Sequence, residues 1–254
     1  MATLLKTRLR RGEKLIGAWC ALPAPAVAEI AGSSGFDFVV LDFQHGLIGD
    51  DMAADMFRAV EATGAAAVAR AGWKDAARLG KLLDFGAAGI IVPMIESARD
   101  AADAMRACLY PPKGMRSFGP VRAMKGRDRP AYMAAIEEET CILPMIETAG
   151  ALAELADIAA VPGVAGLFVG PADLSLSMGL APAREHPDAC FQDALSSVIE
   201  TCRKSGIAAG VQAEPGLAAR RLEEGFTFVT AAMDTALLAE GFEQTLRAER
   251  PAAE

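Results

Sequence analysis

The chain has 254 residues, and its 25 basic and 33 acidic side chains give a formal net charge of −8. With 52% hydrophobic and 23% charged residues, the composition is that of a folded globular protein and excludes a disordered, collagen-like or coiled-coil chain. The acidic balance disfavours nucleic-acid binding, which needs clustered Lys and Arg to release counterions from phosphates. We therefore expect small-molecule partners and no nucleic acid.

The cysteines and the N-terminal region indicate the compartment. The cysteines are odd in number and form no C-x-x-C pair, so neither a disulfide framework nor a cysteine zinc site is indicated; they are Cys20, Cys108, Cys141, Cys190 and Cys202. Residues 15–28 superficially resemble a secretory signal, but Pro23 and Pro25 interrupt them and we interpret their first part as a strand. No apolar run is long enough for a bilayer, so we expect a cytoplasmic protein without a membrane partner.

Short β-rich runs alternate with Ala- and Leu-rich stretches of helical periodicity. The runs cover residues 15–20, 37–41, 66–69, 89–95, 141–146, 165–169, 207–211 and 226–230. Several, such as FVVL and GIIVPMI, are continuously apolar, as expected for parallel strands buried on both faces. Eight βα units in about 250 residues predict an α/β fold, a TIM (β/α)8 barrel, with residues 1–254 as one domain.

Two segments interrupt this alternation. The longest connection, residues 96–140, contains YPPKGMRSFGPVR, and its Pro, Gly and Arg content predicts an extended loop with a functional or interface role. Residues 235–247 are predicted to form an amphipathic helix that closes the barrel.

Polar residues at the carboxyl ends of barrel strands form the active site in this fold. Glu147 and Asp173 follow adjacent predicted strands, so their carboxylates can share one hard divalent cation such as Mg²⁺ or Mn²⁺. The alternative is that both are helix caps. Gly170 and the backbone N–H groups of Ala172 and Asp173 open a predicted helix that can bind a carboxylate or phosphate.

Two further strand ends carry candidate catalytic groups. His45 is a candidate general base, with Asp42 three residues earlier to orient its imidazole; the alternative is an ordinary loop histidine. Arg70 ends the third strand and can bind a substrate oxygen, or form a purely structural salt bridge. No lysine ends a predicted strand, so a Schiff-base mechanism has no candidate nucleophile.

Six segments together resemble a known family over nearly the whole chain and in the same order. They are LDFQHG (41–46), the strand that ends at Arg70, LLDFGAAGIIVPMI (82–95), PPKGMRSFGPVRA (111–123), LPMIET (143–148) and VGPADLSLSMG (169–179). The chain thus resembles the HpcH/HpaI aldolases, which are metal-dependent class II pyruvate aldolases such as the 4-hydroxy-2-oxoheptanedioate and 2-dehydro-3-deoxyglucarate aldolases.

The resemblance implies a role for each matching residue. It implies Glu147 and Asp173 as ligands of Mg²⁺, Mn²⁺ or Co²⁺, Arg70 as the enolate-stabilising arginine, and His45 as the acid/base with Asp42 as its partner. It also implies Asp84 as another active-site acid. The implied substrate contacts are Trp19, Gln44, Arg70, Gly170, Ala172 and Asp173. Better-known members have a glutamate where this chain has Gln44, which places the acceptor pocket in question.

The same resemblance implies an activity and an assembly. The activity is reversible cleavage of 4-hydroxy-2-oxo acids to pyruvate, or hydroxypyruvate, and an aldehyde. The assembly is a hexamer, a trimer of dimers, in which the eighth helix is exchanged between subunits. Phosphoryl transfer to or from pyruvate is an alternative function, although no lysine is placed to neutralise the phosphoryl group. A non-catalytic barrel that holds a metal ion only for stability is another.

Overall fold

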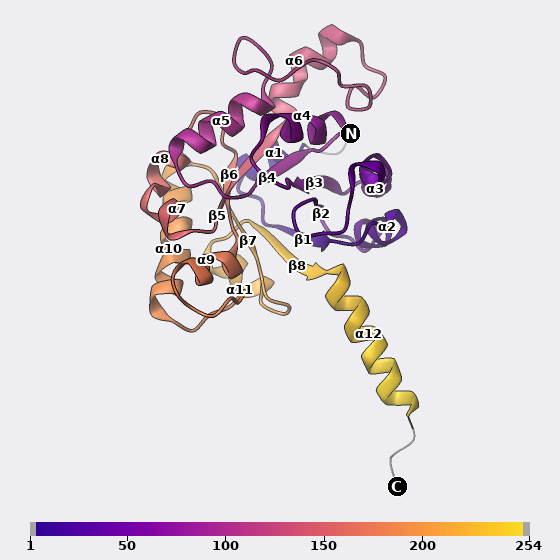
Figure 1. The fold of residues 1–254 in the computed structure, drawn as a ribbon, viewed down its shortest axis with the longest axis vertical. Helices are drawn as coiled ribbons and strands as arrows, with labels where there is room; N and C mark the ends of the chain where they lie inside the picture. The colour runs from indigo at the N-terminus through magenta and orange to yellow at the C-terminus, as the bar shows by residue number, and fades with distance from the viewer. Residues whose placement is uncertain (1–3, 251–254) are drawn as a thin grey trace.

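The computed structural model describes residues 4–250, which form a closed barrel of parallel strands surrounded by helices (Figure 1). Each strand pairs with its neighbours along the chain, and β8 pairs with β1 to close the barrel. The strands are β1 (Leu15–Cys20), β2 (Phe38–Asp42), β3 (Ala66–Arg70), β4 (Gly89–Val92), β5 (Cys141–Ile146), β6 (Gly166–Val169), β7 (Ala208–Gln212) and β8 (Phe228–Met233). The predicted TIM barrel is confirmed.

Helices occupy most of the connections between strands. They are α1 (Leu5–Arg10), α2 (Pro25–Ser33), α3 (Asp50–Thr63), α4 (Ala76–Asp84), α5 (Ala98–Cys108), α6 (Arg129–Glu139), α7 (Ala149–Ala153), α8 (Leu155–Ala159), α9 (Pro171–Ser177), α10 (Ala189–Ser205), α11 (Ala218–Glu224) and α12 (Asp234–Glu249). Gly64 and Gly206 end α3 and α10 in the left-handed conformation, which glycine adopts without strain. None of the helices within residues 4–250 has the length and apolarity needed to cross a bilayer.

Apolar side chains pack on both sides of the strands, which explains the continuously apolar runs. One cluster fills the barrel interior, where the rings of Phe38 and Phe228 stack with centroids 3.8 Å apart. A second cluster lies between the sheet and the outer helices and includes Val39 and Val229. Because neighbouring residues of a strand point to opposite faces, the residues of the interior cluster alternate with residues that pack against the outer helices.

The prediction of an extended loop over residues 96–140 is wrong for about half of that segment, because helices occupy 22 of its 45 residues. It contains α5 and α6, and only the stretch between them is irregular. Ser97 caps α5 by accepting a hydrogen bond from the backbone of Asp100, and α5 buries one apolar face. The Pro- and Gly-rich motif correctly marks an irregular stretch, but the helices on both sides are set by capping and apolar periodicity.

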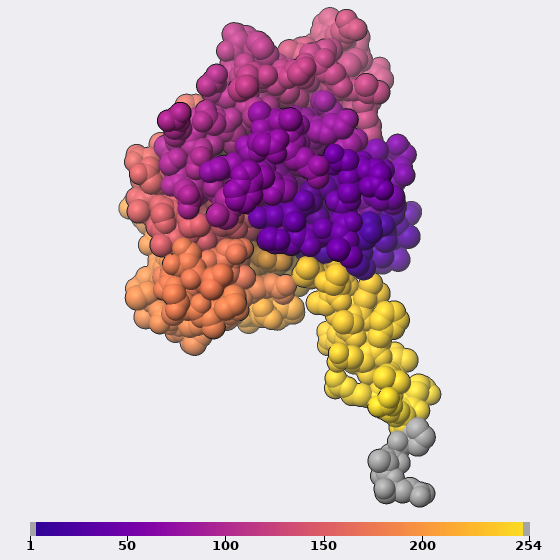
Figure 2. All heavy atoms as spheres, in the orientation of Figure 1, coloured from indigo at the N-terminus to yellow at the C-terminus, as the bar shows by residue number. Residues whose placement is uncertain are grey.

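The helix predicted over residues 235–247 exists as α12, but it does not close its own barrel. It leaves the barrel at β8 and projects away from the rest of the chain (Figures 1 and 2). Of its residues, only Asp234 is buried. Its apolar side chains Leu237, Leu238, Phe242 and Leu246 are 57%, 41%, 72% and 53% exposed. The amphipathic pattern therefore corresponds to an apolar face of α12 that no other part of this protomer covers.

Candidate active site

The carboxyl ends of the strands gather most of the predicted polar residues at one mouth of the barrel. Asp42 ends β2 and lies in register with Arg70, which ends the neighbouring strand β3. Glu147 follows β5, and Asp173 lies in α9 directly after the neighbouring strand β6. The parallel arrangement places all four residues at the same end of the barrel.

Asp42 is a buried anchor that holds several groups at once. Its carboxylate accepts hydrogen bonds from Arg70 Nε at 2.9 Å and Nη2 at 2.5 Å, and from Trp19 Nε1 at 3.1 Å. Burial acts to raise the pKa of Asp42, but the hydrogen bonds and positive charge of Arg70 outweigh it and lower that pKa. Asp42 is therefore a permanent anion that fixes the arginine.

Arg70 forms a structural salt bridge and still has one guanidinium nitrogen available for a substrate oxygen. Its guanidinium forms the buried ion pair with Asp42 and lies over the Trp19 ring, 4.8 Å from the ring centroid. Two of its nitrogens are thereby used, while Nη1 has no hydrogen-bond partner among the described residues. Trp19 is only 1% exposed and supports Arg70 and Asp42, while its implied contact with substrate stays a prediction.

His45 lies in the turn after β2 and is exposed at the mouth. The prediction that Asp42 orients its imidazole needs correction. Asp42 Oδ1 accepts from the backbone N–H groups of Gln44 at 2.9 Å and His45 at 3.2 Å, while Arg70 and Trp19 occupy the rest of the carboxylate. Asp42 thus fixes the turn that carries His45 instead of the ring. Gln44 Oε1 is buried there without a hydrogen-bond partner within residues 4–250.

Glu147 is a carboxylate with one engaged and one unpaired oxygen. It is 1% exposed; Oε1 accepts a hydrogen bond of 2.6 Å from the Met94 backbone, and Oε2 is buried without a partner among the described residues. Burial raises the pKa of Glu147, and the negative charge of Asp173 adds to this against the opposing Met94 and Arg70 contributions. A buried, unpaired anionic oxygen of this kind calls for a cation or proton donor.

The surroundings of Glu147 and Asp173 exclude the interpretation that they are helix caps. Thr148, not Glu147, caps α7, and Gly170, not Asp173, is the cap residue of α9. A Cβ atom at Gly170 would lie 2.7 Å from Glu147 Oε2 and 2.5 Å from Met145 Cε, so a larger residue would force these side chains to shift. Asp173 is exposed in the first turn of α9, where the backbone N–H groups have no intrahelical acceptor.

The metal donors available here are few. Within residues 4–250, no three His, Cys, Asp or Glu side chains gather as a ready-made metal cage. Two carboxylates, one with an unpaired buried oxygen, instead fit a hard divalent cation that completes its coordination with water and substrate oxygens. These two carboxylates are the predicted pair Glu147 and Asp173, and their role as metal ligands stays a prediction.

Asp84 does not join these residues in the protomer. It is the last residue of α4, a helix that starts after β3 and returns toward the amino end of β4. Its carboxylate pairs with Arg116 Nη2 at 2.6 Å. The assignment of Asp84 to the active site of the same chain is therefore corrected, because α4 carries it away from the mouth.

Two residues of the mouth carry contacts that the sequence did not indicate. Met94 adopts a positive φ of 56° and donates its backbone N–H to Glu147. In the sequence, this contact is signalled only by the PMIE motif, which occurs at residues 93–96 and again at 144–147. Asp234 accepts hydrogen bonds from the backbones of Ala21, at 3.0 Å, and Leu22, at 2.9 Å. It thereby ties the end of β8 to the segment after β1.

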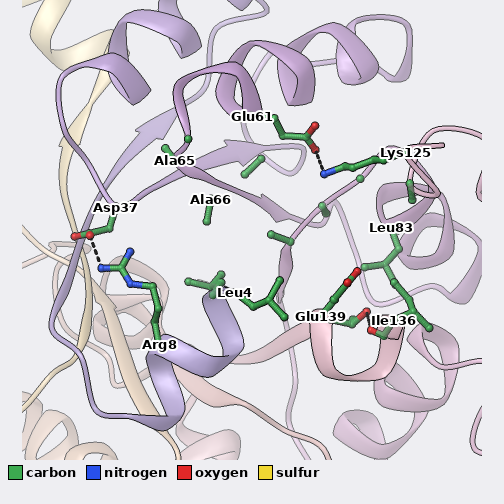
Figure 3. A pocket seen from close by; sticks show the side chains of 18 of the residues that line it. Leu4, Arg8, Asp37, Glu61, Ala65, Ala66, Leu83, Lys125, Ile136 and Glu139 are labelled. Atoms are coloured by element: carbon green, nitrogen blue, oxygen red, sulfur yellow. Dashed lines mark hydrogen bonds and ion pairs between the residues drawn. The ribbon is translucent and has the colours of Figure 1, made fainter. Parts of the chain in front are cut away.

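A separate cavity of about 460 Å³ opens at the other end of the barrel (Figure 3). It is lined by residues that precede the strands, such as Ala65 and Ala66. The charged residues at its edge already form ion pairs, including Arg8 with Asp37 and Lys125 with Glu61. The cavity therefore lies apart from the carboxyl ends of the strands and offers no unpaired charge for catalysis.

The barrel and the polar cluster at its carboxyl-terminal mouth define the protein as a TIM-barrel enzyme. The sequence model of the HpcH/HpaI aldolase/citrate lyase family matches residues 15–241. The chain belongs to this family, and it is a carbon–carbon lyase.

Relatives cover almost the whole chain. The 4-hydroxy-2-oxo-heptane-1,7-dioate aldolase of Salmonella arizonae is 37% identical over 246 residues, which are 96% of this chain and 93% of the relative. An HpcH/HpaI aldolase/citrate lyase family protein from Burkholderia cenocepacia superposes with a TM-score of 0.90 at 32% identity, over 97% of this chain and 99% of that one. An HpcH/HpaI aldolase from Desulfitobacterium hafniense gives 0.90 at 25% identity over 100% of both chains.

Proposed function

We propose that the protein catalyses the reversible aldol cleavage of 4-hydroxy-2-oxo acids to pyruvate, or hydroxypyruvate, and an aldehyde. The observation that carries the proposal is the pairing of an anchored arginine with an unpaired buried carboxylate oxygen at one mouth. Arg70 supplies fixed positive charge, and Glu147 supplies a site for a cation. Cleavage of this bond leaves negative charge on the 2-oxo acid, which such a mouth stabilises.

Glu147 and Asp173 are the proposed ligands of a divalent cation, Mg²⁺, Mn²⁺ or Co²⁺. The unpaired Oε2 of Glu147 and the raised pKa of this carboxyl support the assignment, because a cation there would offset the penalty of burying the charge. When bound, the ion supplies positive charge that polarises the 2-oxo group of the substrate.

Other groups at the mouth stabilise the developing charge, transfer the proton and bind the substrate carboxylate. Arg70 Nη1 faces the keto oxygen where charge develops, held in place by Asp42 and Trp19. His45 removes the proton of the 4-hydroxyl, the C3–C4 bond breaks, and its electrons pass to the 2-oxo acid fragment as the aldehyde forms. A proton returned to C3 completes pyruvate. The amides of Ala172 and Asp173 bind the substrate carboxylate.

The protomers are proposed to assemble through α12. Leu238, Phe242 and Leu246 recur every four residues and form one exposed apolar stripe on the projecting helix. Such a stripe is unfavourable in water and is stabilised when another copy covers it. We propose that α12 packs on a neighbouring subunit in exchange for its helix, within a hexamer built as a trimer of dimers.

The proposed location is the cytoplasm, with small molecules as partners in place of nucleic acid or membrane. All five cysteines are unpaired, and Cys20, Cys108, Cys141 and Cys202 are buried. This usage supports a reducing compartment.

The test is a coupled assay of pyruvate release over a panel of 4-hydroxy-2-oxo acids. It is run in EDTA and after addition of Mg²⁺, Mn²⁺ or Co²⁺. We expect pyruvate from at least one substrate, loss of that activity in EDTA, and its recovery with the ion. Absence of pyruvate or hydroxypyruvate release from the whole panel under every metal condition would refute the proposed function.

A further inference from the structure

Met94 lies at the barrel mouth in a strained backbone conformation. It follows β4 and has a φ of 56°, in the left-handed region that residues other than glycine rarely adopt. Its backbone N–H donates to Glu147 Oε1 at 2.6 Å. A strained residue persists only where its surroundings hold it in place, so a further contact is needed to keep Met94 in this conformation.

Lys74 supplies that contact from a different strand end. It lies four residues beyond Arg70, the last residue of β3, and its Nζ donates to the Met94 carbonyl oxygen at 3.1 Å. The N–H and the carbonyl are the two polar backbone groups of one residue, so the two hydrogen bonds together restrict its φ and ψ. The Lys74 contact therefore opposes relaxation of Met94 to a negative φ.

The charge of Lys74 is balanced within the same group of contacts. Its Nζ pairs with Asp100 Oδ2 at 2.8 Å, and this oxygen also accepts the backbone N–H of Glu96 at 3.1 Å. Asp100 lies in the first turn of α5, a helix that packs against the core. Asp100 thus fixes the ammonium beside Met94, and the pair adds no net positive charge that would repel a cation at Glu147.

We propose that Lys74 is a positioning residue for Glu147 as a metal ligand and acts through the strained backbone of Met94. The inference rests on the proposed function, because it takes a divalent cation as the partner of Glu147. The Met94 N–H occupies Oε1 and leaves Oε2, which is buried without a partner among residues 4–250, as the oxygen free for the ion. Groups that orient a ligating carboxylate are needed for tight binding, so loss of the Lys74 contact weakens binding of the ion.

The experiment measures the Kd of Mn²⁺ by isothermal titration calorimetry on the metal-free protein, a readout independent of turnover. Lys74→Met keeps a long side chain and removes its donor and charge. We expect its Kd to rise about 10- to 100-fold, the range for loss of a group that orients a ligand. Lys74→Arg still donates to a carbonyl and recovers part of the affinity. Lys113→Met is the matched control: it removes an exposed lysine that pairs with Glu137, and it keeps the parent Kd.

Met94→Gly distinguishes positioning from a general structural role. Glycine adopts a positive φ without strain, so Lys74 is no longer needed to hold the conformation. We expect Lys74→Met to raise Kd by less than about 3-fold in this background, whereas an independent structural contribution would raise it by the same factor in both backgrounds. Asp100→Asn gives a second readout should Lys74→Met fail to fold, because it weakens the contact that fixes the ammonium and raises Kd in the same direction.

The outcomes separate this inference from the proposed function. If Lys74→Met binds Mn²⁺ at least as tightly as the parent, or if Met94→Gly leaves the effect of Lys74→Met unchanged, the role of Lys74 is refuted. If the parent itself binds no Mn²⁺, the metal assignment and the role of Lys74 both fail. The aldol function is judged separately, by pyruvate release from the substrate panel. A loss of affinity that Met94→Gly suppresses confirms the inference.

Discussion

Glu147→Gln separates the charge of Glu147 from its shape. The amide oxygen can still accept the Met94 N–H, and the side-chain volume is nearly unchanged. What disappears is a negative charge that is 1% exposed and repelled by Asp173. If this charge exists to hold a cation, the variant loses the cation but not the fold.

The metal-free stability follows from the direction of the pKa shift. Because the pKa of Glu147 is raised in the fold, the native state binds a proton more readily than the unfolded chain. Stability therefore falls as pH rises from the ordinary pKa through the raised one, and the penalty persists at pH 7. We expect metal-free Glu147→Gln to melt at or above the metal-free parent at pH 7, without this pH-dependent decline.

When metal is added, we expect the parent to melt at a higher temperature than Glu147→Gln. At a free-ion concentration about 100 times Kd, binding stabilises the parent by about 2.7 kcal/mol. For a chain of this size, each kcal/mol corresponds to about 2–4 °C, so the parent gains about 5–10 °C. The variant, with one of its two carboxylate ligands neutralised, gains little. Thermal unfolding by circular dichroism at pH 5–8, in EDTA and in Mn²⁺, measures both effects.

Asp42→Asn is the matched control, because this buried carboxyl has its pKa lowered by Arg70 despite its burial. Its charge is stabilising above the ordinary pKa, and its removal leaves Arg70 buried without a counter-charge. We expect a loss of about 3–5 kcal/mol at pH 7, with and without metal. If instead metal-free Glu147→Gln melts far below its parent, or keeps the full metal-induced shift, the assignment of Glu147 is refuted.

Four further variants test the rest of the mouth and the assembly. Arg70→Ala should lower turnover by at least about 10²–10³, with Arg70→Lys and circular dichroism to establish that the barrel persists; near-normal cleavage would contradict its role. His45→Gln should lower kcat by about 10²–10⁴ with little change in KM, and an unchanged kcat would exclude it as the base. Phe242→Glu with Leu246→Glu should yield smaller species in sedimentation velocity without loss of the barrel, since both side chains are exposed in the protomer; an unchanged mass would argue against assembly through α12.

The sequence alone determined the architecture and much of the candidate site. Continuously apolar strands, such as residues 38–41, alternate with helical periodicity, and only parallel strands buried on both faces accommodate that pattern. Strand order then places Asp42, Arg70 and Glu147 at one mouth, because parallel strands end at the same edge. These predictions depend on periodicity and chain direction, which are local properties of a sequence.

Only the tertiary structure decided which groups touch. Asp42 meets Arg70 from 28 positions away instead of the nearby imidazole, and Glu147 receives the Met94 N–H from 53 positions away. Asp84 is carried away from the mouth by the direction of α4 and pairs with Arg116. Contacts of this kind depend on strand register, helix direction and backbone angles such as the positive φ of Met94. Those are set by packing of the whole barrel, since neighbouring residues alone do not specify them.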